Sequence, residues 1–392
     1  MRRDSFLGIA VVLAVVATVA TGITWKVCCD GPPHPAPHPP ASPPPSPTQP
    51  LELTGLIGSE KDAFFNDPDV QAELGRLGLK VTVTDSGSFE MAAMAKQGHY
   101  DFAFPASMEA ADAIRGGDNG GSKSVFYSPL VVVTTPAVKQ FLVDNGLVQK
   151  QQDGTWAFLL SKFLEQVDTG HAWEDLRTGT RPPALTGDIY LISTDPTRSS
   201  SGAFYLAMTS YLANGGKVVA DASGVRQATP TVQKLFREQG QQANTSRNLY
   251  QDFQAGKGRP LIWTYESEPA AQVMHGAFDT TKTAVLYPDV DIETDHTLVA
   301  LTSGAQKLAD ALVNDDKLID LEVKFGFRPY APANQGRFAG QLAQLKAPID
   351  FAPYWAPNAV TQQPPTPQLS VLECLANTAI STSDAPVAGC PQ

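Results

Sequence analysis

Cysteine is scarce in this chain: four occur among 392 residues, and none lies between Cys29 and Cys374. This scarcity excludes a disulfide-dense scaffold, so the body of the protein must be stabilised by ordinary burial of apolar side chains. Cys374 and Cys390 could pair, which would close a small loop near the C-terminus. The length allows two or three ordinary domains, or one two-lobed unit with tails.

Positive charge is the second scarcity. Lysine and arginine together number 29 against 40 aspartates and glutamates, which gives a formal net charge of −11. Binding to DNA or RNA requires a basic patch, and the sequence has no cluster of lysine and arginine large enough to form one. We therefore expect no nucleic-acid partner. An anionic ligand remains compatible with this balance, because a local site can oppose the overall charge.

The familiar enzyme motifs are also missing. The chain has no G-x-S-x-G elbow, no H-E-x-x-H, no C-x-x-C and no Walker loop. The histidines of the body are scattered along it. We therefore expect a protein without catalysis, metal or cofactor. A secreted hydrolase whose catalytic residues come together only on folding is the enzymatic alternative.

The N-terminus contains one long apolar run. Arg2 and Arg3 precede Phe6–Ile23, which no charged residue interrupts. As a helix this run would span roughly 27 Å, close to the hydrocarbon thickness of a bilayer. The arginines should stay in the cytoplasm, so the rest of the chain lies outside it. We expect residues 1–26 to be a retained signal anchor or a cleaved signal peptide.

A proline-rich stretch follows at residues 27–50, and Gly31–Pro50 is its densest part. Proline at this density favours an extended polyproline II stalk that reaches roughly 60 Å. The folded part should begin at about Leu51. We expect it on the extracytoplasmic face of the cell membrane, held by the N-terminal segment, or secreted.

Strand and helix patterns alternate beyond the stalk. Leu53–Ile57, Leu79–Thr84 and Tyr100–Phe104 read as strands, each followed by a loop and a helix. Asp67 and Pro68 suit the first positions of the first long helix. This alternation is typical of an α/β fold with parallel strands and crossover helices.

Small polar residues gather where the expected strands end and helices begin. Ligands of open α/β sheets bind at the carboxyl ends of the strands, and helix N-termini there carry free N–H groups and partial positive charge. Any single serine is better explained as a helix cap, but their repetition on one sheet edge predicts a binding site. The candidate ligand-binding residues are Ser59, Glu60, Ser86, Ser88, Ser107, Arg198, Ser200, Ser201, Gly202, Tyr265 and Glu266.

Arg198 and Glu266 predict ligands of opposite charge. The guanidinium of Arg198, beside serine hydroxyls, could clamp an oxyanion with two hydrogen bonds, although it could equally pair with Asp195. Tyr265 and Glu266 end a strand in the second half of the chain and could close over a ligand. Glu266 would favour a cationic group, which opposes the oxyanion interpretation.

Several segments together resemble a known family. They are Gly58–Lys61, Tyr100–Phe104, Tyr127–Val133, Asp195–Gly202, Tyr287–Leu298 and Phe325–Pro329. The body is similar to bacterial periplasmic-type solute-binding proteins, of the type II branch that includes molybdate, sulfate and phosphate binders. The first of these loops departs from the phosphate binders, because it lacks their glycine- and serine-rich run.

The resemblance implies an α/β, two-lobed periplasmic-binding-protein-like fold with two hinge crossings. The first lobe would comprise residues 51–130 and 286–345, and the second residues 131–285. Residues 346–392 are expected to form an irregular C-terminal tail. The ligand would sit in the cleft between the lobes, which close by a hinge motion.

The expected function is capture of a small polar or anionic solute outside the cytoplasm. The resemblance implies delivery to the permease of an ABC-type importer by a monomeric protein that is tethered to the membrane or secreted. A ligand-sensing or cell-envelope interaction module on the same fold is the alternative that involves no transport.

Overall fold

The computed structural model describes residues 49–116, 121–240, 242–292, 294–352, 362–381 and 390–391. The expected N-terminal segment Phe6–Ile23 and nearly all of the proline-rich stalk lie outside these ranges. Among the described residues, no helix combines the length and the apolar character that crossing a membrane requires.

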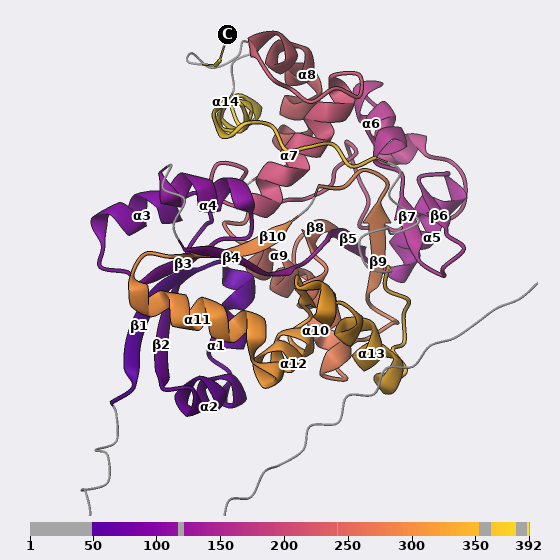
Figure 1. Cartoon of the computed structure of the whole chain (residues 1–392). Coiled ribbons are helices and arrows are strands. Elements are labelled where there is room, and N and C mark those ends of the chain that lie inside the picture. Colours follow the sequence, from indigo (N-terminus) through magenta and orange to yellow (C-terminus); the bar gives the residue numbers. More distant parts are fainter. Residues whose placement is uncertain are drawn as a thin grey trace, which may run out of the picture. The chain divides into compact units, whose positions relative to one another are not determined.

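The described chain is built on two sheets (Figure 1). The first has six strands in the order β11-β4-β10-β3-β1-β2, and β1 runs parallel to both β2 and β3. We call the part built on this sheet the first lobe. Its strands are β1 (Leu51–Ile57), β2 (Leu79–Asp85), β3 (Phe102–Phe104), β4 (Ser122–Tyr127), β10 (Asp295–Ala300) and β11 (Arg328–Pro329).

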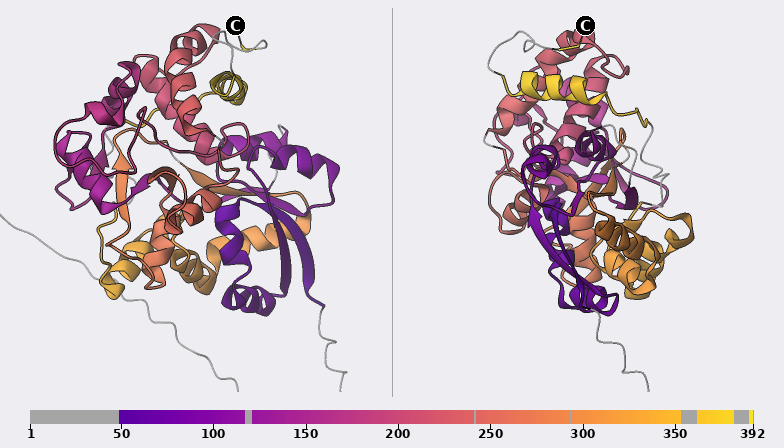
Figure 2. Two further views of the ribbon diagram at one scale, coloured as in Figure 1. Left: turned by 180° about the vertical axis from the view of Figure 1, so that it is seen from behind. Right: turned by 60° about the vertical axis from the view of Figure 1, so that its left-hand side comes forward.

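Alternating side chains bury both faces of this sheet. Leu53 and Ile57 of β1 join the apolar cluster on one face, whereas Leu56 joins the cluster on the other. This is the two-residue period of a strand covered on both sides. One face carries α1 (Asp62–Phe65), α2 (Pro68–Arg76), α11 (Ser303–Asn314) and α12 (Asp316–Lys324), and the other carries α3 (Met91–Gln97) and α4 (Met108–Arg115) (Figure 2).

The second sheet has five strands in the order β6-β7-β9-β5-β8, and we call the part built on it the second lobe. Its strands are β5 (Leu130–Thr134), β6 (Val148–Lys150), β7 (Trp156–Phe158), β8 (Leu261–Tyr265) and β9 (Ala284–Pro288). Its helices are α5 (Pro136–Asp144), α6 (Leu160–Asp168), α7 (Ser200–Ala213), α8 (Ala222–Gln239) and α9 (Ser246–Gln254). Two further helices, α10 (Ser267–Met274) and α13 (Gly336–Leu345), pack with α12. Short 3₁₀ turns lie at η1 (Ser59–Lys61), η2 (Trp173–Asp175) and η3 (Pro332–Asn334).

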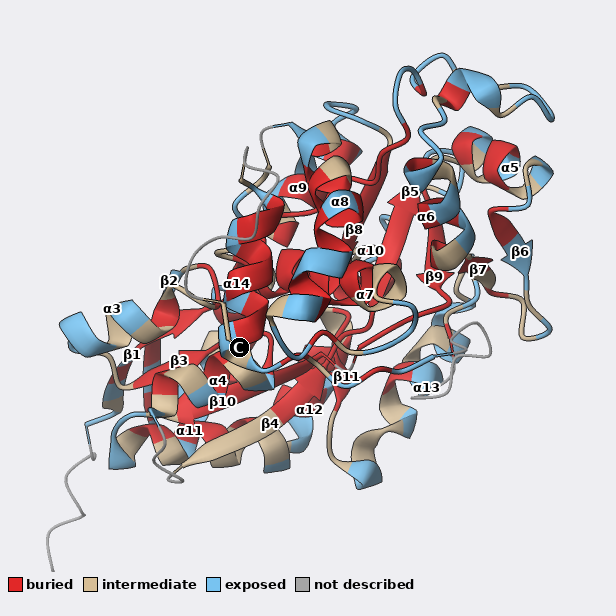
Figure 3. Ribbon diagram, turned by 90° about the horizontal axis from the view of Figure 1, so that it is seen from above, coloured by how far each residue is buried: buried red, intermediate tan, exposed pale blue. Residues whose placement is uncertain are grey.

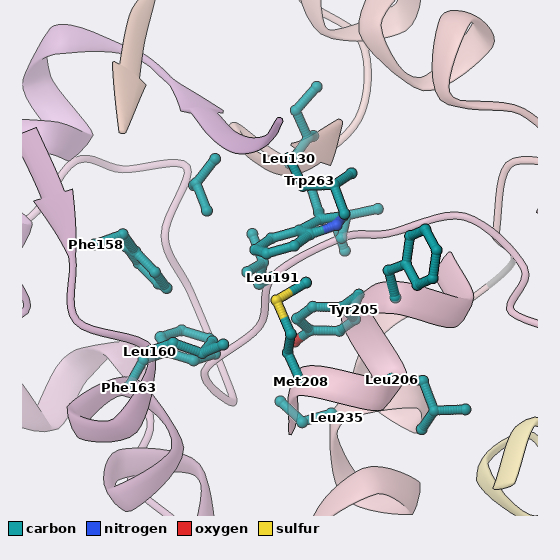
Figure 4. Close-up of a cluster of buried hydrophobic side chains, with 14 of the residues drawn as sticks. Leu130, Phe158, Leu160, Phe163, Leu191, Tyr205, Leu206, Met208, Leu235 and Trp263 are labelled. Carbon is teal, nitrogen blue, oxygen red and sulfur yellow. The ribbon is translucent and has the colours of Figure 1, made fainter. Parts of the chain in front are cut away.

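Helix α7 is the central helix of the second lobe. Its sequence is apolar or small on every side, and all residues from Ser200 to Ser210 are buried (Figure 3). A helix that is apolar all round is typical of a buried core element. Tyr205 of α7 packs on Trp263 of β8 with ring centroids 5.3 Å apart, and Leu191 and Met208 lie beside the pair (Figure 4).

The chain passes between the sheets at the two expected crossings. The first lies between Tyr127, where β4 ends, and Leu130, where β5 begins; the second spans residues 289–294. Ser128 joins the two, because its hydroxyl accepts a hydrogen bond from Ser267 N at 2.9 Å and its carbonyl accepts one from the Thr294 hydroxyl. The boundary expected at residues 285–286 falls inside β9, which pairs with β5 and β7 through Pro288.

The expectation of an irregular tail at residues 346–392 is corrected by α14 (Leu369–Ala379). The tail leaves α13, and Gln362 exchanges backbone hydrogen bonds with Asp289 and Asp291 in the second crossing. Helix α14 then packs against α7 and α8, and its apolar face completes the core of the second lobe. The described part of the tail from Gln362 to Ala379 therefore contacts both the second crossing and the second lobe. Cys374 of α14 and Cys390 are joined by a disulfide.

Candidate ligand-binding cleft

Two serine hydroxyls meet where the lobes face each other. Ser107 of the first lobe and Ser200 of the second lie 3.2 Å apart, oxygen to oxygen. Both are almost completely buried, with exposed fractions of 0% and 1%. Ser107 follows β3, and Ser200 opens α7, so the structure brings together two of the candidates from distant parts of the chain.

Each of these serines stands at the N-terminus of a helix. Ser107 caps α4, since its hydroxyl accepts a hydrogen bond from Ala110 N at 3.2 Å. Ser200 is the first residue of α7, and the side chain of the N-cap residue Ser199 makes no such capping bond. Helix N-termini carry partial positive charge and unsatisfied N–H groups, so two of them facing each other form a natural place for an anion.

The loop before α7 is held by hydroxyl contacts and by a close backbone approach. Ser201 Oγ lies 2.8 Å from Thr194 Oγ1 and 3.2 Å from Ser199 Oγ. A Cβ atom at Gly202 would lie only 2.2 Å from the carbonyl oxygen of Thr194. Glycine at this position lets the first turn of α7 press against the segment that precedes it.

Ser86 and Ser88 lie in the loop after β2. Ser88 Oγ accepts a hydrogen bond from Ala106 N at 3.2 Å and so fixes the segment that carries Ser107. Ser86 Oγ donates to the carbonyl of Gly87 at 3.2 Å. Ser88 is buried, and its contact makes it a support of the serine pair.

Arg198 links the two lobes. Its Nε lies 2.8 Å from Glu90 Oε1 of the first lobe, and its Nη1 donates to Asn244 Oδ1 at 3.0 Å. The alternative pairing with Asp195 is wrong, because the Asp195 carboxylate accepts its hydrogen bonds from Thr197. The oxyanion clamp at Arg198 stays a prediction.

Arg247 forms a second link between the lobes that sequence reasoning missed. Its Nη1 lies 2.9 Å from Asp62 Oδ2 and donates to the carbonyl of Ser59 at 3.4 Å. This contact holds the loop after β1, where Ser59 is buried, against α9. No motif marks such a pair in the sequence, because it depends on how the two lobes pack.

Glu60 belongs to a buried charged cluster behind that loop. Its carboxylate binds the ammonium of Lys61, and Oε1 lies 3.4 Å from Nδ1 of His296. Burial alone would raise the pKa of Glu60, but Lys61 and His296 hold it well below its ordinary value. Burial, together with nearby Lys61, lowers the pKa of His296 to about 4, so the imidazole is neutral at neutral pH.

Glu266 accepts buried hydrogen bonds from neighbouring side chains. Arg328 donates to both of its carboxylate oxygens, at 2.6 and 2.8 Å, and the hydroxyl of Tyr287 donates to one of them. Arg328 also donates to the carbonyl of Ala352 in the tail at 2.7 Å. The expectation that Glu266 closes over a ligand is therefore replaced by a buried ion pair at the crossings. Neighbouring Tyr265 is buried against the ring of His296, with centroids 5.3 Å apart.

Among the residues that the structure describes, no group of three or more histidine, cysteine, aspartate or glutamate side chains is arranged to hold an ion.

Comparison with known proteins agrees with this architecture. The sequence model for a family described as bacterial extracellular solute-binding protein matches residues 71–315. The fold is similar to that of iron-bound HitA from Pseudomonas aeruginosa, with a TM-score of 0.55 and 12% identity over 84% of this chain and 99% of that one. No curated protein matches the chain in sequence.

A periplasmic thiamin-binding protein is also similar, with a TM-score of 0.51 and 13% identity over 86% of this chain and 99% of that one. At these identities the two structures speak for the fold alone. They confirm the expected two-lobed α/β arrangement.

Proposed function

We propose that this protein, which belongs to the family of bacterial extracellular solute-binding proteins, captures a small oxyanion between its lobes. Membership of that family makes it a binding protein rather than an enzyme and gives it an extracytoplasmic place of action. The proposal adds the class of solute, an oxyanion, to what membership of the family shows.

The contact between Ser107 and Ser200 carries the proposal. The two hydroxyls come from different lobes, are buried, and stand at the N-termini of α4 and α7. Hydroxyl and backbone N–H donors together can hold an oxyanion without a charged side chain. The protein's negative overall charge is no obstacle, since the field of two helix ends is local.

A bound oxyanion would take the place of the direct hydroxyl contact and join the lobes through itself. The Arg198–Glu90 and Arg247–Asp62 pairs reach across the same interface, so they would form as the lobes close. Binding would then select the closed arrangement from an opening and closing hinge.

Titration calorimetry with sulfate, phosphate and molybdate tests the solute class. Ser200→Ala should weaken binding of the preferred oxyanion about tenfold, the loss of one hydrogen bond to a charged group. Ser107→Ala should act similarly and also lose a helix cap. Thr135→Ala is the matched control, because Thr135 caps α5 of the second lobe in the same way. Binding of neutral sugars alone, or unchanged affinity in both serine variants, would refute the proposal.

Delivery to an ABC-type permease and attachment to the membrane complete the proposed role. Both are supported by the family and by the apolar segment Phe6–Ile23 with its proline-rich stalk. Fractionation of cells should place the full chain with the membrane, and a chain without residues 1–26 should stay inside the cell. Uptake of labelled oxyanion should fall when the gene is deleted; a change of signalling without a change of uptake would favour the sensing alternative.

A further inference from the structure

A second pocket lies at the edge of the interface between the lobes. Its cavity of about 180 Å³ is lined by Glu60 from the first lobe and by residues of α9 and α10. Arg247 of α9 and Ser267 and Glu268 of α10 supply the polar groups that matter below. The oxyanion site proposed above does not depend on this pocket.

Several buried polar atoms of the pocket have no partner. Glu268 Oε1, Ser267 Oγ and the hydroxyl of Tyr250 make no hydrogen bond among the residues that the structure describes, and the first two can accept one. Ser267 has an exposed fraction of 3%, so water reaches it poorly. A buried acceptor left unmatched costs about 1–3 kcal/mol, which makes a donor-bearing ligand favourable here.

The charged groups around the pocket disfavour an anionic ligand. The carboxylate of Glu60 stays ionised beside Lys61, and it repels a second negative charge in the pocket. Burial raises the pKa of Glu268 to about 8; Arg247 opposes this rise and Glu60 adds to it. Arg247 is already paired with Asp62, so an anionic ligand would find two carboxyl groups and no unpaired guanidinium.

We infer that this pocket binds the primary ammonium group of a small amine, with Glu268 and Ser267 accepting its hydrogen bonds and Glu60 adding electrostatic attraction. A primary ammonium offers three donors on one small centre, which suits a pocket whose lining includes several acceptor oxygens.

Binding is linked to proton release. At neutral pH the Glu268 carboxyl is mostly protonated, and an ammonium beside it favours the ionised form. One proton should therefore leave per amine bound. Affinity should rise with pH until the amine itself loses its proton, at about pH 10. Glu60, Arg247, Tyr250 and His275 are the other titratable or charged groups that line the pocket.

Calorimetry on the folded protein with ethylammonium chloride tests this site. Runs near neutral pH in two buffers of different ionisation enthalpy report the proton count. Tetramethylammonium chloride carries the same charge without N–H donors, and sodium chloride controls for ionic strength. We expect saturable binding of ethylammonium, release of close to one proton, and no binding of the two control salts. Equal responses to ethylammonium and tetramethylammonium would overturn the inference.

Variants of α10 test whether ethylammonium binds in this pocket. Glu268→Gln should weaken ethylammonium binding at least tenfold and abolish proton release, and Ser267→Ala should weaken it several-fold. Glu322→Gln is the matched control, because Glu322 is also a buried carboxyl with a raised pKa but does not line the pocket. Retained binding in both α10 variants refutes the site. Oxyanion affinity should be unchanged in Glu268→Gln, so this inference and the proposed function can fail separately.

Discussion

Arg198 of the second lobe and Glu90 of the first form an ion pair of 2.8 Å that joins the two lobes. A backbone hydrogen bond joins the same two segments, since Phe89 N donates to the carbonyl of Arg198 at 3.3 Å. A Cβ atom at Gly87 would lie 2.5 Å from that carbonyl, so glycine is needed for this approach. The contact joins the loop after β2 to the loop before α7, the two segments that bring the serines together.

The Arg198–Glu90 pair should favour lobe closure more than it favours folding. Both side chains are more than a third exposed, at 40% and 37%, so the pair should contribute only about 0.2–1 kcal/mol. Arg198→Gln should therefore leave the urea midpoint almost unchanged but enlarge the radius of gyration in small-angle scattering. Glu90→Gln should have the same effect, and the double variant should show no further change. Full additivity of the two effects would contradict a direct link between these residues.

The Glu266–Arg328 pair should be far more important for stability. Both residues are buried, with side-chain exposures of 0% and 5%. Arg328→Met would leave the Glu266 carboxylate buried without its partner and should cost about 3–5 kcal/mol in urea unfolding. The double variant Glu266→Met with Arg328→Met should recover much of this loss. Lys80→Met breaks the exposed pair with Glu52 and should cost less than about 1 kcal/mol.

His296 should make stability depend on pH below neutrality. Its folded-state pKa of about 4 lies below the ordinary value of 6.5, so the unfolded chain binds a proton more readily in this window. Stability should fall as pH decreases from about 6.5 to 4, by roughly 3 kcal/mol in all. His296→Phe should lack this part of the slope, whereas variants of the exposed His171 should keep it. Urea unfolding across this pH range measures the difference in free energy of unfolding between the wild type and His296→Phe. Glu268 changes stability with pH in the opposite direction, but it is present in both proteins, so its effect cancels in this difference.

Glu109 should weaken oxyanion binding. It lies in the first turn of α4, and burial raises the pKa of its carboxyl. Any ionised fraction occupies the positive end of the same helix that the proposed oxyanion uses. Glu109→Gln should therefore raise oxyanion affinity about twofold to fivefold by calorimetry. Glu165→Gln, in the last turns of α6, is a control for the change of net charge and should leave the affinity as it is.

The disulfide between Cys374 and Cys390 should stabilise the second lobe. A bridge that closes a loop of this length contributes about 3 kcal/mol. Thermal unfolding with and without dithiothreitol should show a lower midpoint for the reduced protein. Cys374→Ser should start at that lower midpoint and should not respond to the reductant. If reduction leaves the wild-type midpoint unchanged, α14 is held by its packing alone.

The sequence predicted those features that depend on local pattern. The segments Leu53–Ile57 and Tyr100–Phe104 read as strands, which are present as β1 and β3, and Asp67 caps α2 as expected. Placing Ser107 and Ser200 in one binding edge was possible because polar residues at strand ends repeat in both halves of the chain.

Features that depend on contacts between distant segments were not predictable. Nothing near Arg198 marks Glu90 as its partner, and nothing near Glu266 marks Arg328. Helix α14 was missed because prolines precede it and its apolar residues suit either a core or a surface helix. The structure decides, since Val371, Leu372 and Leu375 are all buried in the second lobe.

The route of the tail bears on how the protein reaches its folded state. The first sheet needs β10 and β11 from late in the chain, and the core of the second lobe needs α14 from its final part. Neither lobe can be completed until nearly the whole polypeptide is present, so such non-local contacts should make folding slow. A chain that is exported from its N-terminus would therefore stay unfolded during export and could be handled by secretion machinery for unfolded polypeptides. It would become compact only after its last residues emerge.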